Sequence, residues 1–257
     1  MTDMTKYPDG TFCWVELSTS SGEGAKRFYT ELFGWTTSEV PLGDGTVYVM
    51  LQKDGKDVAA LYENTRMGNI PPNWLSYVAV SNLDEVTERS KSLGAHVVAG
   101  PFDVGESGRM SLLSDPQGAA FALWQAKKHI GAELVNEPGS LCWNELATSD
   151  VDAARTFYSS LLGWNIKQNP GYDEIDVNGK PNGGMMQLQA EWGAIPPNWL
   201  PYFAVSDTDA IIEKTKAAGG QVRMGPAEAG DIGRFAVLAD PQGATFAVIR
   251  LNKPPAS

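Results

Sequence analysis

Cys13-Trp14-Val15-Glu16-Leu17, near the start of the chain, returns 129 residues later (143 − 14) as Cys142-Trp143-Asn144-Glu145-Leu146. The match extends outward, because the Phe-Tyr and Gly-Trp pairs that follow also return at this offset. Later motifs return at an offset of 125 (195 − 70): Ile70-Pro71-Pro72-Asn73-Trp74, Gly108-Arg109 and Asp115-Pro116-Gln117-Gly118-Ala119. A period of this size is that of a whole domain, so the sequence predicts a duplicated domain and not a solenoid of short repeats.

The repeat predicts two domains, 1–128 and 129–257, with 126–139 as the linker between them. The drop in offset means a net loss of four residues (129 − 125) from the second copy between Trp164 and Ile195. A surface loop tolerates such a change better than a strand or a helix.

Each copy divides into two units of the same pattern. In the first unit, 12–18 is rich in β-forming residues, Ser21 is placed to cap a helix, and Gly34 is placed to end it. The turn Asp115-Pro116-Gln117-Gly118 joins the last two strands of the second unit. The pattern predicts an α+β fold of βαβββ units, with further strands at 47–52, 58–62, 75–80, 96–99, 109–113 and 120–125.

Composition limits the possible partners. The chain has 31 acidic and 20 basic residues and a net charge of −11, so we do not expect it to bind nucleic acids through their phosphates. No apolar stretch approaches the roughly 18 residues of a membrane span, and the N-terminus has no leader-like pattern, so we expect a cytoplasmic protein that does not bind membranes. Cys13 and Cys142 occupy equivalent repeat positions, which favours two buried thiols over a disulfide.

The motifs resemble those of the vicinal oxygen chelate superfamily, which includes glyoxalases, bleomycin-resistance proteins and extradiol dioxygenases. The resemblance is carried by Trp-x-Glu-Leu, Phe-Tyr and Gly-Trp, and by Gly-Arg followed by Asp-Pro-Gln-Gly-Ala, in both copies. It is nearest to tandem-domain glyoxalase-like proteins and covers nearly the whole chain. It implies two tandem glyoxalase-like domains, each of two βαβββ units that form an eight-stranded bowl around a small-molecule ligand.

The resemblance also implies where metal ligands would lie. In metal-dependent members these positions correspond here to Trp14, Leu75, Trp143 and Leu200 on first strands, and to Ala122 and Ala247 on last strands. None of these side chains offers the oxygen or imidazole donors that such metals need. We therefore expect no metal and no other cofactor.

Alternation along a strand places residues two apart on the same face. Trp14 then shares the inner wall with Glu16, and Trp143 shares it with Glu145. We predict that Glu16 and Glu145 are catalytic, because a carboxyl group among aromatic rings has a raised pKa and can exchange protons near neutral pH. The alternatives are an ion pair with Arg109 or Arg234, or a side chain turned to solvent.

Further residues are candidates for substrate binding. Tyr77 and Tyr202 are placed to hydrogen-bond a carbonyl or phenol, although their pattern favours packing in the core with each hydroxyl bonded locally. Arg109 and Arg234 are candidates to anchor an anion, with a salt bridge to an acidic loop, at Asp103 or Glu106 for Arg109, as the alternative. The remaining candidates are assigned to the inner walls: Trp14, Trp143, Ala122, Trp124 and Ala247.

Three hypotheses for function follow. The first is a metal-independent lyase, isomerase or cyclase that encloses a small apolar or aromatic molecule and uses a buried glutamate as acid or base. The second is a non-catalytic binding protein of the drug-resistance type, and the third a metal-dependent lyase of methylglyoxal-type adducts. The expected partner is a small-molecule ligand, and the chain is expected to be a monomer of two pseudo-equivalent domains or a homodimer.

Overall fold

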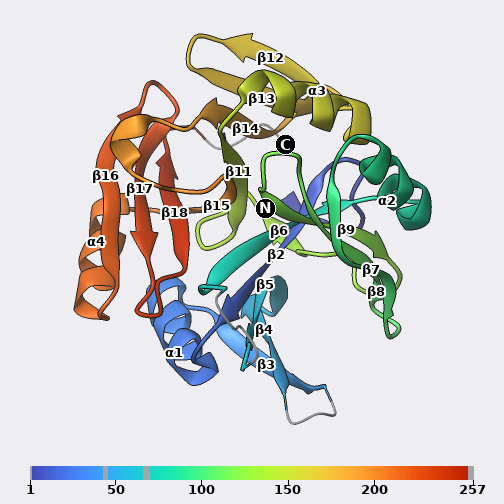
Figure 1. Cartoon of the computed structure of the whole chain (residues 1–257). Helices are drawn as coiled ribbons and strands as arrows, with labels where there is room; N and C mark the ends of the chain where they lie inside the picture. Colours follow the sequence, from blue (N-terminus) through green and yellow to red (C-terminus); the bar gives the residue numbers. More distant parts are fainter. Residues whose placement is uncertain (1, 43–45, 66–69, 254–257) are drawn as a thin grey trace.

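The computed structural model describes residues 2–42, 46–65 and 70–253 and contains two eight-stranded mixed sheets (Figure 1). The strand order of sheet 1 is β3 (Thr36–Pro41), β4 (Val47–Lys53), β5 (Lys56–Glu63), β2 (Phe12–Thr19), β6 (Asn73–Ala79), β9 (Ala120–Ala126), β8 (Gly108–Ser114) and β7 (His96–Val104). The strand order of sheet 2 is β12 (Asn165–Asn169), β13 (Tyr172–Val177), β14 (Lys180–Gln187), β11 (Leu141–Thr148), β15 (Asn198–Ala204), β18 (Thr245–Leu251), β17 (Gly233–Ala239) and β16 (Gln221–Ala229). The predicted α+β fold of paired βαβββ units is confirmed.

Four α-helices accompany the sheets in the described ranges: α1 (Gly22–Phe33), α2 (Leu83–Ser92), α3 (Val151–Leu162) and α4 (Thr208–Ala217). The Ser21 side chain caps α1 by accepting from the N–H of Gly24, and Gly34 ends that helix with a left-handed φ of 71°. Asp150 caps α3 in the same way through the N–H of Ala153. These helix boundaries agree with the sequence prediction, because caps act over one turn of local sequence.

Shorter elements complete the chain. A 3-10 turn, η1, spans Ala190–Trp192, and the short strands β1 (Thr2–Asp3) and β10 (Leu134–Val135) pair with each other. No helix in the described part of the chain is long and apolar enough to cross a membrane.

The outer strand β3 is a feature that the hydrophobic pattern did not locate. All six of its residues are exposed, so it carries no alternation of buried and exposed positions. Its pairing places Val40 opposite Tyr48, and the corresponding pair in sheet 2 is Asn169 and Tyr172. The offset between the copies is therefore already 124 at this point (172 − 48), so the β3–β4 hairpin accounts for five lost residues (129 − 124). One residue is regained before Ile195 (125 − 124).

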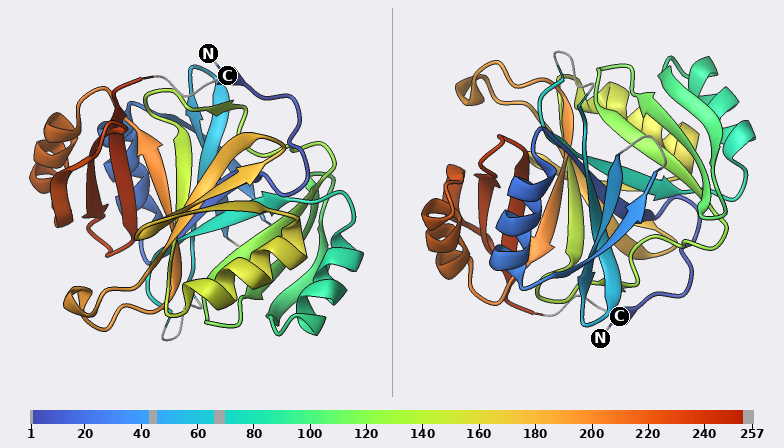
Figure 2. Two further views of the ribbon diagram at one scale, coloured as in Figure 1. Left: turned by 90° about the horizontal axis from the view of Figure 1, so that it is seen from above. Right: turned by 90° about the horizontal axis from the view of Figure 1, so that it is seen from below.

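The two domains exchange helix contacts across their interface. Helix α1 of the first domain packs beside α4 of the second, and α2 packs beside α3 (Figure 2). The resulting core is shared, since Phe28 and Tyr29 of α1 lie in one buried cluster with Phe203 and Phe246 of sheet 2. Neither domain therefore completes its hydrophobic core alone.

The same interface explains two of the repeated motifs. The hydroxyl of Tyr158 on α3 donates to Asp115 Oδ2 at 3.0 Å, and Trp199 Nε1 donates to that hydroxyl at 2.9 Å. Tyr29 makes the equivalent bond to Asp240 at 3.1 Å, with Trp74 as its donor at 3.0 Å. The Phe-Tyr motif of each copy thus holds the Asp-Pro-Gln-Gly turn of the other copy.

Candidate functional site

Each sheet has one face that packs on helices and one that does not, and we call the second the inner face. Val15 and Leu17 of β2 belong to the core cluster that contains α1, so the alternating Trp14 and Glu16 point to inner face 1. The structure brings the predicted aromatic and small residues together there: Trp14, Tyr77, Ala122 and Trp124. Inner face 2 gathers their counterparts: Trp143, Tyr202 and Ala247, with Leu200, Phe235 and Val237.

Glu16 lies at the centre of inner face 1 between two phenols. Tyr48 on β4 donates its hydroxyl to Glu16 Oε2 at 2.6 Å, and Tyr77 on β6 donates to Oε1 at 3.0 Å. Trp14 Nε1 in turn donates to the hydroxyl of Tyr48 at 3.4 Å. One carboxyl group thus joins three strands of the sheet through side chains that meet only in the folded protein.

Glu145 has the same surroundings on inner face 2. Its Oε1 accepts from the hydroxyl of Tyr202 on β15 at 2.9 Å. Tyr172 on β13 is its second phenol partner, and Trp143 Nε1 donates to the hydroxyl of Tyr172 at 2.7 Å. The cluster of one glutamate, two tyrosines and one tryptophan therefore occurs in both domains.

Burial disfavours the charged form of the carboxyl group in both clusters. Burial raises the pKa of Glu16 and of Glu145, and the phenol hydrogen bonds offset part of that shift. Glu16 nevertheless keeps some exposed area. Within the described ranges, no cation forms an ion pair with either glutamate, in contrast to the ion-pair alternative. Burial and the nearby glutamate also raise the pKa of Tyr77 and of Tyr202, so both remain phenols.

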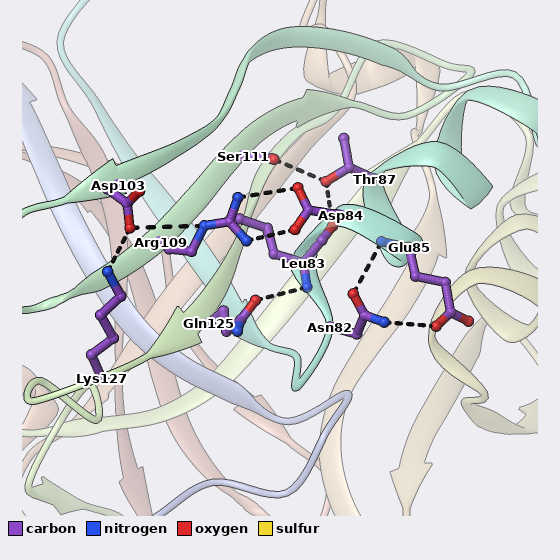
Figure 3. A network of polar contacts seen from close by, with 10 residues as sticks. All are labelled: Asn82, Leu83, Asp84, Glu85, Thr87, Asp103, Arg109, Ser111, Gln125 and Lys127. Carbon is purple, nitrogen blue, oxygen red and sulfur yellow. Dashed lines mark hydrogen bonds and ion pairs between the residues drawn. The ribbon is translucent and has the colours of Figure 1, made fainter.

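Arg109 and Arg234 lie outside these clusters, and both form salt bridges with acidic side chains, the alternative that the sequence left open. Arg109 pairs in bidentate fashion with Asp84 of α2, at 2.5 and 3.1 Å, and its Nε lies 3.8 Å from Asp103 (Figure 3). Arg234 bonds Asp209 and Glu228, each at 3.0 Å. The neighbouring Met110 packs on inner face 1, so alternation turns Arg109 toward the helix side of the sheet.

Tyr48 and Tyr172 are the functional candidates that sequence reasoning missed. Neither lies on a first or last strand of its unit, which were the strands assigned to the inner wall. Their equivalence is visible only when the five-residue difference in the β3–β4 hairpin is placed correctly, because they share an offset of 124 (172 − 48). A tyrosine conserved between the copies at that offset was the available signal.

The donor set does not fit the metal that many members of the fold hold. In the part of the chain that the structure describes, no three His, Cys, Asp or Glu side chains lie close enough together to bind an ion. The groups around Glu16 are phenols and an indole, which remain protonated and donate hydrogen bonds. A divalent cation needs several deprotonated or neutral lone-pair donors directed at one point.

The two inner faces are covered differently. On inner face 1, the His129 ring packs edge-on against Trp14 at 4.7 Å between ring centroids, and Tyr7 donates to the carbonyl of Ala132 at 2.7 Å. Burial lowers the pKa of His129, which makes the imidazole a neutral packing partner. Trp14 is only 3% exposed as a result, whereas its counterpart Trp143 is partly exposed.

One cavity lies beside inner face 1, and another lies on the helix side of the sheets. One of about 310 Å³ borders inner face 1 and is lined by Lys6, Tyr7, Asp9, Ala79, Val80, Ser81, Trp124, Gln125, Ala126 and Ile130. The other, of about 260 Å³, lies between α1 and α4 and includes Phe28 and Lys214 in its lining. Neither cavity has Glu16 or Glu145 among its lining residues.

The raised pKa of Glu16 predicts how stability depends on pH. A carboxyl group whose pKa is raised by folding stabilises the protein fully below the unfolded pKa, and this contribution is lost as pH rises through the folded pKa. We expect the Glu16→Gln variant, which stays neutral, to have a Tm above that of the wild type at pH 8 and close to it at pH 4. Calorimetry across this range measures the difference. Glu31→Gln on the exposed face of α1 is the control, and a Tm gap for Glu16→Gln that does not change with pH would contradict the assignment.

Gly184 makes room for Tyr172 and gives a second prediction. A Cβ at Gly184 would lie 2.1 Å from the hydroxyl oxygen of Tyr172, so in Gly184→Ala the phenol must swing away from Trp143 and Glu145. Since the displaced group is the end of a side chain, we expect a stability loss of only about 1 kcal/mol. Loss of one phenol donor should raise the pKa of Glu145 further, as followed by carbon-13 NMR of the carboxyl group. Ala60→Gly, the matched position in sheet 1, should leave Glu145 unchanged; an unchanged Glu145 titration in Gly184→Ala would refute this packing.

Comparison with known proteins agrees with this architecture. Residues 11–123 and 128–248 each match the model of the Glyoxalase/Bleomycin resistance protein/Dioxygenase superfamily, and the chain belongs to that family. It is 42% identical to "Putative glyoxylase CFP32" of Mycobacterium bovis, over 97% of this chain and 98% of the relative.

Two further matches extend the comparison. The chain is 35% identical to "Anthracycline biosynthesis protein DnrV" of Streptomyces peucetius, over 97% of this chain and 96% of that protein. The Mn(II)-bound glyoxalase from Novosphingobium aromaticivorans superposes with a TM-score of 0.69 at 13% identity, covering 96% of this chain and 84% of that one. At such low identity the superposition shows a common fold.

Proposed function

We propose that each inner face binds a flat, mostly apolar small molecule and that Glu16 and Glu145 transfer a proton to and from it. The observation that carries this proposal is the pair of phenols on each glutamate, at 2.6 and 3.0 Å around Glu16. A buried carboxyl group without a cationic partner is costly to ionise, and such groups are concentrated at sites of acid–base chemistry.

The arrangement suits abstraction of a proton next to a carbonyl group. The carboxylate takes the proton from carbon, the C–H electron pair moves to form an enolate, and a tyrosine O–H stabilises the negative oxygen. Return of the proton from the carboxyl group to another carbon completes an isomerisation, so no oxidant or co-reactant is consumed. The partly exposed Met50 and Leu75 provide apolar surface for the ligand body on inner face 1, where Trp14 and Trp124 are buried, and the partly exposed Trp143 does so on inner face 2.

The relatives support the class of ligand. The name of DnrV refers to anthracycline biosynthesis, and anthracyclines are flat fused-ring compounds that contain carbonyl and phenol groups. Such a ligand matches the aromatic lining and the phenol donors of both inner faces.

Binding without chemistry is the second candidate function. It is favoured by the hydrogen bond that Glu145 already accepts from Tyr202, because a ligand that merely stacks on the partly exposed Trp143 would leave it in place. A metal-dependent lyase is the third hypothesis, and the donor set around the glutamates gives it no support.

Deuterium exchange distinguishes the first two functions. The probe is β-tetralone, an aromatic ketone with acidic protons next to its carbonyl, incubated with the whole chain in deuterated buffer and followed by proton NMR. Exchange faster than in buffer supports proton transfer. Quenching of tryptophan fluorescence by the probe without faster exchange would favour binding alone, and the absence of both effects would contradict the proposal.

A further inference from the structure

The two inner faces differ along their outer arms, by which we mean the β3–β4 hairpin in sheet 1 and the β12–β13 hairpin in sheet 2. The strand register of the two hairpins aligns their residues one by one. In sheet 1, Ser38 pairs with Met50 next to the pair of Val40 and Tyr48. Cross-strand partners project from the same face of a sheet, so Ser38, Val40 and Met50 lie beside the tyrosine that bonds Glu16.

In sheet 2 the corresponding positions are polar and charged. Lys167 pairs with Glu174 next to the pair of Asn169 and Tyr172, on the face of the tyrosine that bonds Glu145. Lys167 Nζ lies 3.0 Å from Glu174 Oε1 and 3.7 Å from Asp176 Oδ2. Two carboxylates thus face one ammonium group, which leaves an excess of negative charge at this arm.

These groups are open to a ligand. The side chains of Lys167 and Glu174 are 54% and 35% exposed, and Val40 is 46% exposed in sheet 1. An exposed valine beside a phenol provides only apolar contact, whereas a half-exposed glutamate can accept hydrogen bonds from an added ammonium group.

The strands at the opposite edge of each sheet, β7 and β16, differ less. Phe102 on β7 pairs with Met110, which belongs to inner face 1, and Phe102 is 43% exposed. The matching pair in sheet 2 is Ala227 and Phe235, with the large ring moved inward. Met224 on β16 pairs with Val237 of inner face 2 and is 38% exposed, so an exposed apolar side chain lies at this edge of both faces and the contrast is confined to the outer arms.

We propose that the two inner faces select different ligands: inner face 1 takes an uncharged aromatic molecule, and inner face 2 takes an aromatic molecule that carries an amine. The specificity-determining residues are Val40 and Met50 in the first case and Lys167, Asn169 and Glu174 in the second. This inference rests on the proposed function, because it assumes that both inner faces bind aromatic ligands.

The test measures two probes on the whole chain by isothermal titration calorimetry: β-naphthol and its aminomethyl derivative, which adds one ammonium group. We expect the amine to bind at one site per chain. In Glu174→Met, which gives sheet 2 the residue of sheet 1 and leaves Lys167 paired with Asp176 alone, the excess negative charge is removed and the affinity for the amine should fall about fivefold, as expected for a partly exposed charge pair. Affinity for β-naphthol should be unchanged or higher.

The matched variant runs in the opposite direction. Met50→Glu places one carboxylate without a facing lysine beside Tyr48 in sheet 1 and should create a second site for the amine. Added salt should weaken the amine and leave β-naphthol unaffected. Equal binding of both probes at both faces, or swapped arms that leave the affinities unchanged, would overturn this inference and leave the proposed function intact. Failure of either probe to bind would count against the proposed function and this inference together.

Discussion

The Glu16→Gln/Glu145→Gln double variant is expected to exchange deuterium into β-tetralone no faster than buffer, a loss of about 10²-fold or more. Glutamine keeps the size of the side chain and can still bond the phenols of Tyr48 and Tyr77, but it cannot accept a proton from carbon. Because the variant removes the cost of burying a charge, its Tm at neutral pH should equal or exceed that of the wild type. Proton NMR of the ketone and calorimetry of the protein measure the two effects.

The single variants show which inner face works. If both faces act alike, Glu16→Gln and Glu145→Gln should each retain about half of the exchange; if one face acts alone, one single variant should be as inactive as the double. Glu31→Gln on α1 is the matched control and should exchange at the wild-type rate. Full exchange by the double variant would show that neither glutamate is the base.

The Tyr158→Phe variant is expected to lower the free energy of unfolding by about 2–4 kcal/mol, since buried groups lose hydrogen-bond partners. Its hydroxyl accepts from Trp199 Nε1 and donates to Asp115 Oδ2, and without it both atoms stay buried with one partner fewer. These groups come from both domains, so the loss weakens the interface as well as one core. Urea unfolding followed by tryptophan fluorescence measures the change.

Two further variants serve as references for Tyr158→Phe. Tyr29→Phe breaks the equivalent bonds to Trp74 and Asp240, so it should cost a similar amount. Tyr7→Phe removes a single bond to the carbonyl of Ala132 and should cost only about 1 kcal/mol. If Tyr158→Phe were no more destabilising than Tyr7→Phe, the inter-domain hydrogen bonds would not have the stabilising role assigned to them.

Local patterns were sufficient for much of the fold. Ser21, Gly34 and Asp150 mark helix ends because caps act within a single turn, and the alternation in β2 placed Trp14 and Glu16 on one face because the strand period is two. The outer strand β3 escaped detection because all of its residues are exposed, and the hydrophobic pattern is the signal that reveals a strand.

The candidate site was only partly visible. Glu16 and Tyr77 were found because they lie on neighbouring strands whose first-strand role the motif indicates. Tyr48 was missed because its contact with Glu16 across β5 depends on the register of β4, β5 and β2. The sequence left Arg109 between a ligand anchor and a salt bridge, because the direction of its side chain depends on which face of β8 meets α2, and a Gly-Arg motif does not specify that.

The sequence alone thus determined the duplication, the βαβββ units, the family and the position of one carboxyl group in each copy, since all of these follow from local periodicity and repeated motifs. Tertiary structure alone decided which phenols surround each carboxyl group, which helix completes which core, and how the outer arms differ. The physical reason is that these features depend on strand register and domain pairing, which join residues 30 to more than 200 positions apart and leave no periodic trace in the chain.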